Sequence, residues 1–136
     1  MASPAVANGV IYIYSNDGIA ENIGSDGPPA GSAFAVNGET GAVLWETKMT
    51  PGAFGGIAVA NGLMFFTTLD GTIHALNTDT GAELWSNKML DGAATKAAGG
   101  VTVAGGMVYA GAGWDWTPLL DPPAGGVTAY ALPESP

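Results

Sequence analysis

Three consecutive residues near the C-terminal end combine side chains that could carry chemistry. Trp114, Asp115 and Trp116 place one carboxylate between two large aromatic surfaces. A tryptophan face stacks on a planar ring or a sugar, and a carboxylate beside it accepts a proton or binds Ca²⁺. The prolines that follow equally fit a stiffened loop whose tryptophans pack on the structure beneath, so Asp115 is a candidate catalytic residue with a structural alternative.

A second group of oxygen-bearing side chains lies nearer the N-terminus. Asn16, Asp17, Glu21, Asn22 and Asp26 stand among glycines and supply enough oxygen atoms for one calcium ion. Their spacing is irregular and matches no EF-hand loop. A solvated acidic loop is the competing interpretation of Asp17, Glu21 and Asp26.

Composition excludes several classes of function. The chain has 136 residues, no cysteine and a net charge of −9, with only Lys48, Lys88 and Lys96 as cations. This balance repels phosphate backbones and anionic membrane surfaces, and no apolar run reaches transmembrane length, so neither nucleic acid nor membrane insertion is expected. The chain has one histidine, His74, and no Ser/His/Asp catalytic set can be assembled around it convincingly. Residues 1–4 form no signal peptide, and whether the chain is complete stays open.

The elements that position these residues follow from an internal repeat. The pattern Ala-x-Asn-x-x-Thr-Gly-x-x-x-Trp spans residues 35–45 and recurs at residues 75–85, a displacement of 40 residues. A period of this length, with a tight turn and a tryptophan in each unit, is typical of the four-stranded blades of a β-propeller.

Three short hairpins support this all-β interpretation. Residues 6–12, 59–65 and 103–109 each contain two apolar stretches joined by Asn-Gly or Gly-Gly. These dipeptides supply the positive φ angles that a type I′ turn requires, and nothing in the chain has a helical period. We assign blade 1 to residues 3–49 with a long loop at 16–31, blade 2 to residues 50–89, and an incomplete blade 3 to residues 90–133 with a long loop at 113–126.

The third blade departs from the repeat. Residues 127–132 match the third strand of blade 2, which places Tyr130 in the position of His74 and Phe34 and gives His74 a packing role. Pro133 then replaces the motif asparagine, and no fourth strand or tryptophan follows. We therefore expect about three blades, the last without its outer strand, in either a partial propeller or a ring completed by oligomerisation.

Equivalent connections of a propeller emerge on one face, so the two long loops should rise together beside the central channel. The inter-blade connections at residues 50–55 and 90–99 open on the same face. Long loops on a rigid scaffold commonly carry binding groups. Lys96 is the only cation in these inter-blade connections, and an ordinary surface lysine is its alternative. Lys48 and Lys88 recur after each motif tryptophan and are interpreted as structural.

The repeated pattern resembles the tryptophan-docking motif of the quinoprotein propeller family, whose dehydrogenases carry pyrroloquinoline quinone (PQQ). The resemblance gives the motif a structural role, with each tryptophan between neighbouring blades, Thr-Gly in the turn and the asparagine capping it. Similar repeats occur in an outer-membrane assembly lipoprotein and in sensor domains. Residues 55–65 and 99–109 look more like the C-terminal blades of PQQ alcohol dehydrogenases, including the polyvinyl-alcohol type. The motif residues are Asn37, Thr40, Gly41, Trp45, Asn77, Thr80, Gly81 and Trp85.

This resemblance implies the C-terminal portion of a PQQ-dependent dehydrogenase that oxidises an alcohol or polyol in the periplasm or outside the cell. PQQ and Ca²⁺ would be its cofactors, with Lys96, Trp114 and Trp116 as candidate contacts of the quinone, and the isolated chain would be inactive. The alternative is a non-catalytic module that binds proteins or glycans. The expected partners are the remaining blades of a longer propeller or a second copy of the chain, and whether the chain is an enzyme stays open.

Overall fold

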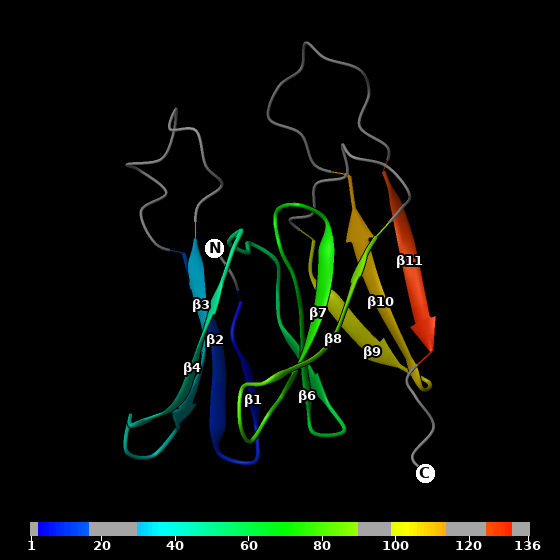
Figure 1. Ribbon diagram of the computed structural model, residues 1–136. Coiled ribbons are helices and arrows are strands. Elements are labelled where there is room, and N and C mark those ends of the chain that lie inside the picture. The colour runs from blue at the N-terminus through cyan, green and yellow to red at the C-terminus, as the bar shows by residue number, and fades with distance from the viewer. Residues whose placement is uncertain (1–2, 17–29, 90–98, 114–124, 132–136) are drawn as a thin grey trace.

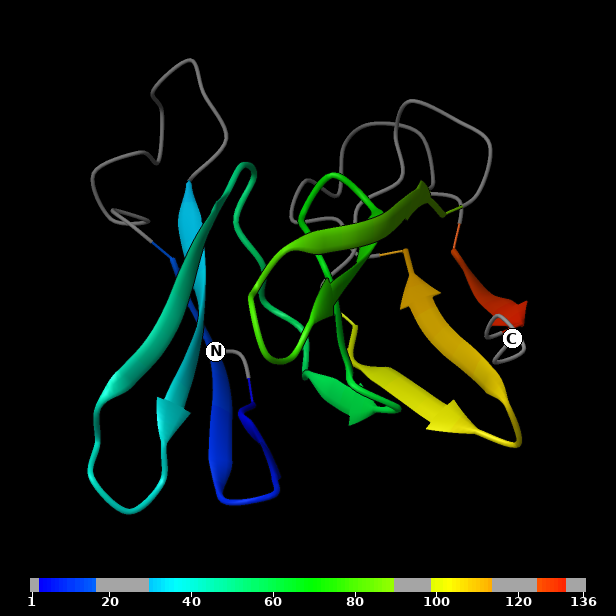
Figure 2. The same cartoon turned by 60° about the horizontal axis from the view of Figure 1, so that its bottom comes forward.

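The computed structural model describes residues 3–16, 30–89, 99–113 and 125–131. These residues form strands and turns without a helix, and the strands make three antiparallel sheets that stand side by side in chain order (Figures 1 and 2). This confirms the predicted architecture of propeller blades. Blade 1 contains β1 (Ala5–Ala7), β2 (Val10–Asn16), β3 (Gly31–Asn37) and β4 (Val43–Met49); blade 2 contains β5 (Ala58–Ala60), β6 (Leu63–Thr67), β7 (Thr72–Asn77) and β8 (Glu83–Lys88); blade 3 contains β9 (Val101–Ala104), β10 (Met107–Ala112) and β11 (Gly126–Ala131).

The first hairpin of every blade has the turn that the sequence predicts. Asn8 and Asn61 both have φ of 52°, and the glycines after them have φ of 76° and 74°. Gly105 and Gly106 of blade 3 also have positive φ, at 57° and 77°. Two consecutive positive φ angles match the twist of the flanking strands, and asparagine tolerates this conformation better than most residues.

The turn between the third and fourth strands has the same construction in blades 1 and 2. The side-chain oxygen of Asn37 accepts hydrogen bonds from the backbone amides two and three residues further on, both at 2.9 Å. Asn77 does the same at 2.8 and 3.0 Å. Gly41 and Gly81 close these turns with φ of 72°, a conformation that favours glycine.

The hydrophobic cores lie between the blades. One cluster joins blade 1 to blade 2 and a second joins blade 2 to blade 3. A single four-stranded sheet has two faces and no interior, so its apolar side chains leave water only when a neighbouring sheet covers them. The first cluster includes Tyr12, Tyr14, Ala35, Trp45, Met64, Phe66 and Leu76, and the second includes Phe65, Ile73, Ala75, Met89, Val101, Val108 and Ala110.

Trp45 makes the most specific contact between blades 1 and 2. Its side chain is 9% exposed, and its Nε1 donates a hydrogen bond of 2.8 Å to the carbonyl of Thr78. The neighbouring Thr47 hydroxyl donates to the carbonyl of Gly81 at 2.7 Å. A Cβ atom at position 81 would lie 2.6 Å from the indole ring, so the tryptophan fits only against a glycine.

Backbone contacts join the blades at their innermost strands. The Ile57 amide donates to the carbonyl of Ser3 at 3.2 Å, and the Val101 amide donates to the carbonyl of Gly56 at 3.3 Å. Thr67 also donates to the carbonyl of Gly99 at 3.0 Å. A Cβ atom on Gly55 would overlap that same carbonyl, so glycine permits the close approach of adjacent sheets near the propeller axis.

The predicted position of Tyr130 is wrong. In blade 3, Tyr130 of β11 pairs with Val108 of β10. The residue of blade 2 that corresponds to Val108 is Met64, and Met64 pairs with Leu76. Tyr130 therefore takes the position of Leu76, two residues further along than the position of His74. A slip of two residues keeps the same side chains on the same face, so the alternation of the sequence could not distinguish the two registers.

The second motif tryptophan, Trp85, is in a different environment from Trp45. It is 38% exposed, and its ring meets that of Tyr130 edge-on with centroids 5.0 Å apart. In the described part of blade 3 no turn covers Trp85 as the turn of residues 77–81 covers Trp45. The two tryptophans occupy equivalent positions of the repeat, but in the described residues only Trp45 is covered by the turn of a neighbouring blade. They can therefore be compared by the same substitution.

We predict that Trp45→Phe destabilises the protein by about 2–3 kcal/mol, because it leaves the partly buried Thr78 carbonyl without its donor and opens space beside Gly81. Trp85→Phe, the matched control, should cost about 1 kcal/mol or less. Urea unfolding of both variants measures the difference. Equal losses would contradict the assignment of Trp45 as the principal contact between blades 1 and 2.

Candidate functional site

The candidate site is the edge of the propeller at which β2, β6 and β10 end, which we call the loop face. The structure confirms that both long insertions occupy the same connection of their blades, between β2 and β3 and between β10 and β11. The strand ends that bound these insertions lie along the upper edge in Figure 1, together with the connection at residues 50–55. The described residues of this face therefore include the strand ends that the two insertions connect.

Asn16 fixes the base of the first insertion to the connection between blades 1 and 2. Its Nδ2 donates to the carbonyl of Ala53 at 2.6 Å, and its Oδ1 accepts from the Ala53 amide at 2.9 Å. The Leu69 amide donates to the carbonyl of Gly52 at 2.9 Å. These bonds tie the end of β2, the connection at residues 50–55 and the β6–β7 turn into a single polar base, in which the Asn16 side chain has a structural role.

Asp70 organises the β6–β7 turn of the loop face. Thr68 and Thr72 donate hydroxyl hydrogen bonds to its carboxylate at 2.7 and 3.0 Å, and the Lys88 ammonium lies 3.5 Å away. Burial raises the pKa of Asp70, but these hydrogen bonds and the nearby Lys88 outweigh it, so the net pKa lies below the usual value. Asp70 is therefore an ionised structural carboxylate.

His74 combines packing with a polar link. Its ring stacks on Phe66 with centroids 5.3 Å apart and an interplanar angle of 17°. Its Nδ1 lies 2.7 Å from Glu83, and its Nε2 lies 3.0 Å from the Thr68 hydroxyl. The packing role was predicted, but the polar link was missed, because Glu83 pairs with Leu76 and reaches His74 only diagonally across the two strands.

The residues predicted to carry chemistry lie outside the described residues. Three sets of residues are concerned: the carboxylate between two tryptophans in the second insertion, the lysine of the second inter-blade connection, and the acidic residues of the first insertion. Their proposed roles stay predictions. The residues are Trp114, Asp115 and Trp116; Lys96; and Asp17, Glu21 and Asp26.

The described residues contain no cluster of metal-ligating side chains. Within residues 3–16, 30–89, 99–113 and 125–131, no group of three or more His, Asp or Glu side chains could bind a metal. Lys48 pairs with Glu46 at 2.9 Å and Lys88 with Asp70, as expected for structural lysines.

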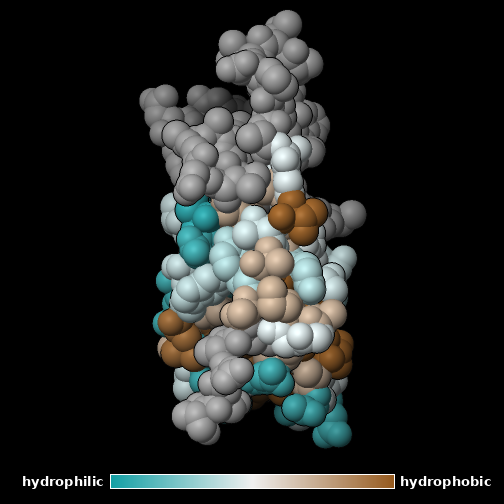
Figure 3. All heavy atoms as spheres, turned by 90° about the vertical axis from the view of Figure 1, so that its right-hand side faces the viewer, coloured by the Kyte–Doolittle hydropathy of each residue, from teal (hydrophilic) through white to brown (hydrophobic). Residues whose placement is uncertain are grey.

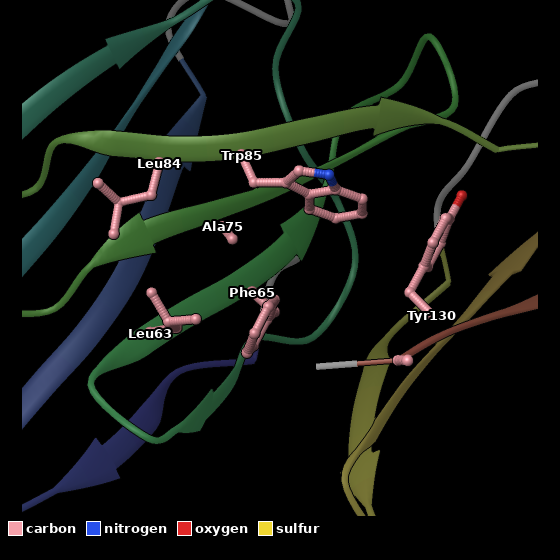
Figure 4. A pocket seen from close by; sticks show the side chains of 7 residues that line it. Leu63, Phe65, Ala75, Leu84, Trp85 and Tyr130 are labelled. Atoms are coloured by element: carbon pink, nitrogen blue, oxygen red, sulfur yellow. The ribbon is translucent and has the colours of Figure 1, made fainter. Parts of the chain in front are cut away.

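A separate apolar groove of about 500 Å³ lies between blades 2 and 3. In Figure 4 the side chains of β6 and β8 face Tyr130 of β11 across this groove. Burial raises the pKa of the Tyr130 phenol. The corresponding space between blades 1 and 2 holds the turn of residues 77–81, so the groove marks an interface between blades. Its lining residues are Leu63, Phe65, Ala75, Leu84, Trp85, Tyr130 and Ala131.

The three sheets and their repeated turns define a β-propeller segment built from quinoprotein-type repeats. A family model described as outer membrane protein assembly factor BamB matches residues 29–131, and the chain therefore belongs to this family of PQQ-type propeller repeats. No curated protein matches the sequence. The described residues include no helix long and apolar enough to cross a membrane.

Several solved structures share the fold. A europium-containing methanol dehydrogenase is 24% identical with a TM-score of 0.72, over 97% of this chain and 23% of that one. A quinohemoprotein alcohol dehydrogenase from Comamonas testosteroni is 21% identical with a TM-score of 0.68, over 96% and 19%. BamB from Moraxella catarrhalis is 20% identical with a TM-score of 0.59, over 81% and 31%. The chain thus spans less than a third of each of these structures.

Because the pKa of Asp70 is lowered on folding, its carboxylate stabilises the protein above the pKa of the unfolded state, and this contribution is lost as the pH falls through the folded value. Asp70→Asn should therefore be less stable than the wild type at pH 7, with the difference shrinking below about pH 4. Urea unfolding between pH 7 and pH 3 measures this. Asp79→Asn, in an exposed turn, controls for the loss of one charge, and a pH-independent effect of Asp70→Asn would count against the assignment.

Proposed function

We propose that the chain supplies blades to a PQQ-dependent propeller dehydrogenase that oxidises an alcohol or polyol. The observation that carries this proposal is the position of both insertions on one loop face of a PQQ-type repeat fold. The fold similarity to a methanol dehydrogenase and to a quinohemoprotein alcohol dehydrogenase supports it. Since the chain spans less than a third of those structures, it contributes one part of the ring, and by itself it does not turn over substrate.

The proposed cofactor contacts come from the candidate residues already named. Lys96 would pair with a carboxylate of PQQ, and Trp114 and Trp116 would flank the ring. Asp115 would accept the substrate proton or bind Ca²⁺, and the acidic group of the first insertion offers further oxygen ligands. When bound, PQQ supplies the electron acceptor for substrate oxidation. A periplasmic or extracellular location belongs to the same proposal.

The second candidate function is a non-catalytic module that binds proteins or glycans. Its support is the description of the matching family as an outer-membrane assembly factor, together with the fold similarity to BamB. The two candidates differ in one measurable property, which is the affinity for PQQ.

A titration with PQQ in the presence of Ca²⁺, followed by tryptophan fluorescence, tests the choice. We expect saturable quenching for the wild type and about tenfold weaker binding for Lys96→Ala, since one charge-assisted contact is lost. Trp114→Phe should reduce the amplitude of quenching. Lys48→Ala, a lysine that pairs with Glu46, is the matched control. Quenching that does not saturate, or that Lys96→Ala leaves unchanged, would favour the module.

A further inference from the structure

One connected network of polar side chains lies within blade 2. His74 of β7 is at its centre, with Glu83 of β8 at one end and Asp70 of the β6–β7 turn at the other. The His74 side chain is 12% exposed, and Thr68, whose hydroxyl joins it to Asp70, is buried. On the side of the molecule that Figure 3 shows, by contrast, hydrophilic residues of the described surface lie in separate groups around a neutral and hydrophobic middle. In a buried network each donor must meet an acceptor, so the positions of its hydrogens can be worked out.

The Thr68 hydroxyl has a single hydrogen and three polar neighbours. Oδ1 of Asp70 lies 2.7 Å away and the carbonyl of Thr72 lies 3.3 Å away. Both accept, because the lowered pKa of Asp70 keeps its carboxylate ionised. The hydrogen therefore points to Asp70, the nearer acceptor, and a lone pair of the Thr68 oxygen faces Nε2 of His74 at 3.0 Å. Nε2 must then carry a hydrogen of its own.

The other ring nitrogen of His74 also meets an acceptor. Nδ1 lies 2.7 Å from Oε2 of Glu83, and Oε1 of the same carboxylate accepts a hydrogen bond from the Ser86 hydroxyl at 3.1 Å. The side chain of Glu83 is 41% exposed, and an exposed carboxylate is ionised near neutral pH. A neutral imidazole has one N–H, whereas the two partners of His74 require two.

We propose that His74 is an imidazolium in the folded protein and that its second proton controls the hydrogen bonding of the β6–β7 turn. While both ring nitrogens carry hydrogens, Thr68 donates to Asp70. Nδ1 keeps its hydrogen against Glu83, so deprotonation takes the proton of Nε2 to solvent and makes this nitrogen an acceptor. The Thr68 hydroxyl then turns from Asp70 to Nε2. Asp70 keeps its two hydrogen bonds from Thr72 and loses the shortest of the three.

The surroundings of His74 hold the additional charge. Phe66 stacks on the ring with centroids 5.3 Å apart, a separation within the range of cation–π contacts. Burial opposes the charge, and the two charge-assisted hydrogen bonds offset this cost. Lys88 is a like charge, but its ammonium lies 3.5 Å from Asp70 and pairs with it. Tyr14 of β2 approaches through Phe66, with centroids 5.3 Å apart. The charged and titratable groups that the described structure places around His74 are Glu83, Asp70, Lys88 and Tyr14.

The β6–β7 turn carries the effect to the loop face. The Thr68 amide donates to the carbonyl of Thr72 at 2.9 Å, and the next amide, that of Leu69, donates to the carbonyl of Gly52 at 2.9 Å. Asp70 therefore lies one residue from the bond that joins this turn to the connection at residues 50–55. A proton taken up or released at His74 changes the bonding of the polar base of the loop face.

Nitrogen-15 NMR of the imidazole ring tests the proposal, and the signals are unambiguous because His74 is the only histidine of the chain. An unperturbed histidine is about three-quarters neutral at pH 7. We expect both ring nitrogens of His74 to be protonated at this pH. Glu83→Gln removes the charge beside Nδ1 and should move the loss of the second proton to lower pH. Glu39→Gln, in the β3–β4 turn at the opposite edge from the loop face, is the matched control and should leave it unchanged.

The Thr72 amide reports the effect on the turn, because it donates to Asp70 at 3.2 Å. Its chemical shift should change with the same midpoint as the His74 ring. Thr68→Val removes the hydroxyl and should abolish this change, whereas Thr68→Ser keeps the hydroxyl and should retain it. Circular dichroism verifies that the variants fold.

Urea unfolding adds a measurement of the linkage. The second proton of His74 stabilises the folded state while it is bound, so this contribution is present at low pH and is lost as the pH rises through the titration of His74. The stability difference between the wild type and Glu83→Gln should therefore be larger at pH 6 than at pH 9.

Two results would overturn the proposal. One is a His74 ring with a single protonated nitrogen at pH 7 in the wild type, which needs no substitution to observe. The other is a response of the Thr72 amide that Thr68→Val leaves intact. These measurements involve no PQQ, so a failure of this proposal and a failure of cofactor binding are separate outcomes.

Discussion

The structure depends on the burial of each sheet face by the next sheet. A blade is one layer thick, and the two cores of the described structure both lie between blades. The burial of apolar area between sheets is non-directional, so it does not by itself fix how one sheet sits on another. The indole of Trp45 supplies that direction, because its Nε1 must reach the Thr78 carbonyl while its ring rests on Gly81. Packing holds the blades together, and the Trp45 contact fixes how blade 2 sits on blade 1.

The sequence predicts most of this fold because its signals are local and repeated. The hairpins at Asn8, Asn61 and Gly105 are encoded by adjacent residues that tolerate positive φ, and the structure has them. The error at Tyr130 has a different origin. The strand that carries it follows a long insertion, so no tight turn fixes its register from the sequence. Its pairing with Val108 is decided by contacts with β10 and blade 2, which a single sequence does not display.

The candidate site was predictable only as a location. The length of the two connections predicts that both insertions lie on one face, and the order of the strands agrees. The individual roles of Asp115 and Lys96 depend on side-chain positions that lie outside the described residues. The link between His74 and Glu83 could not be predicted from spacing, because its partners meet only diagonally across paired strands. Polar contacts of this kind depend on register, and register was the weakest part of the sequence interpretation.

The position of blade 2 between two cores has a consequence for amide hydrogen exchange. An amide of β6 or β7 becomes accessible only when contacts on both sides of its sheet separate, whereas β1 and β11 can open after a single separation. In stacked repeats, stability is close to a sum of nearest-neighbour interactions. Protection should therefore be greatest in the middle strands and decline toward both ends of the chain. The slowest-exchanging amides would lie beside Phe65 and Phe66, whose rings point into opposite cores.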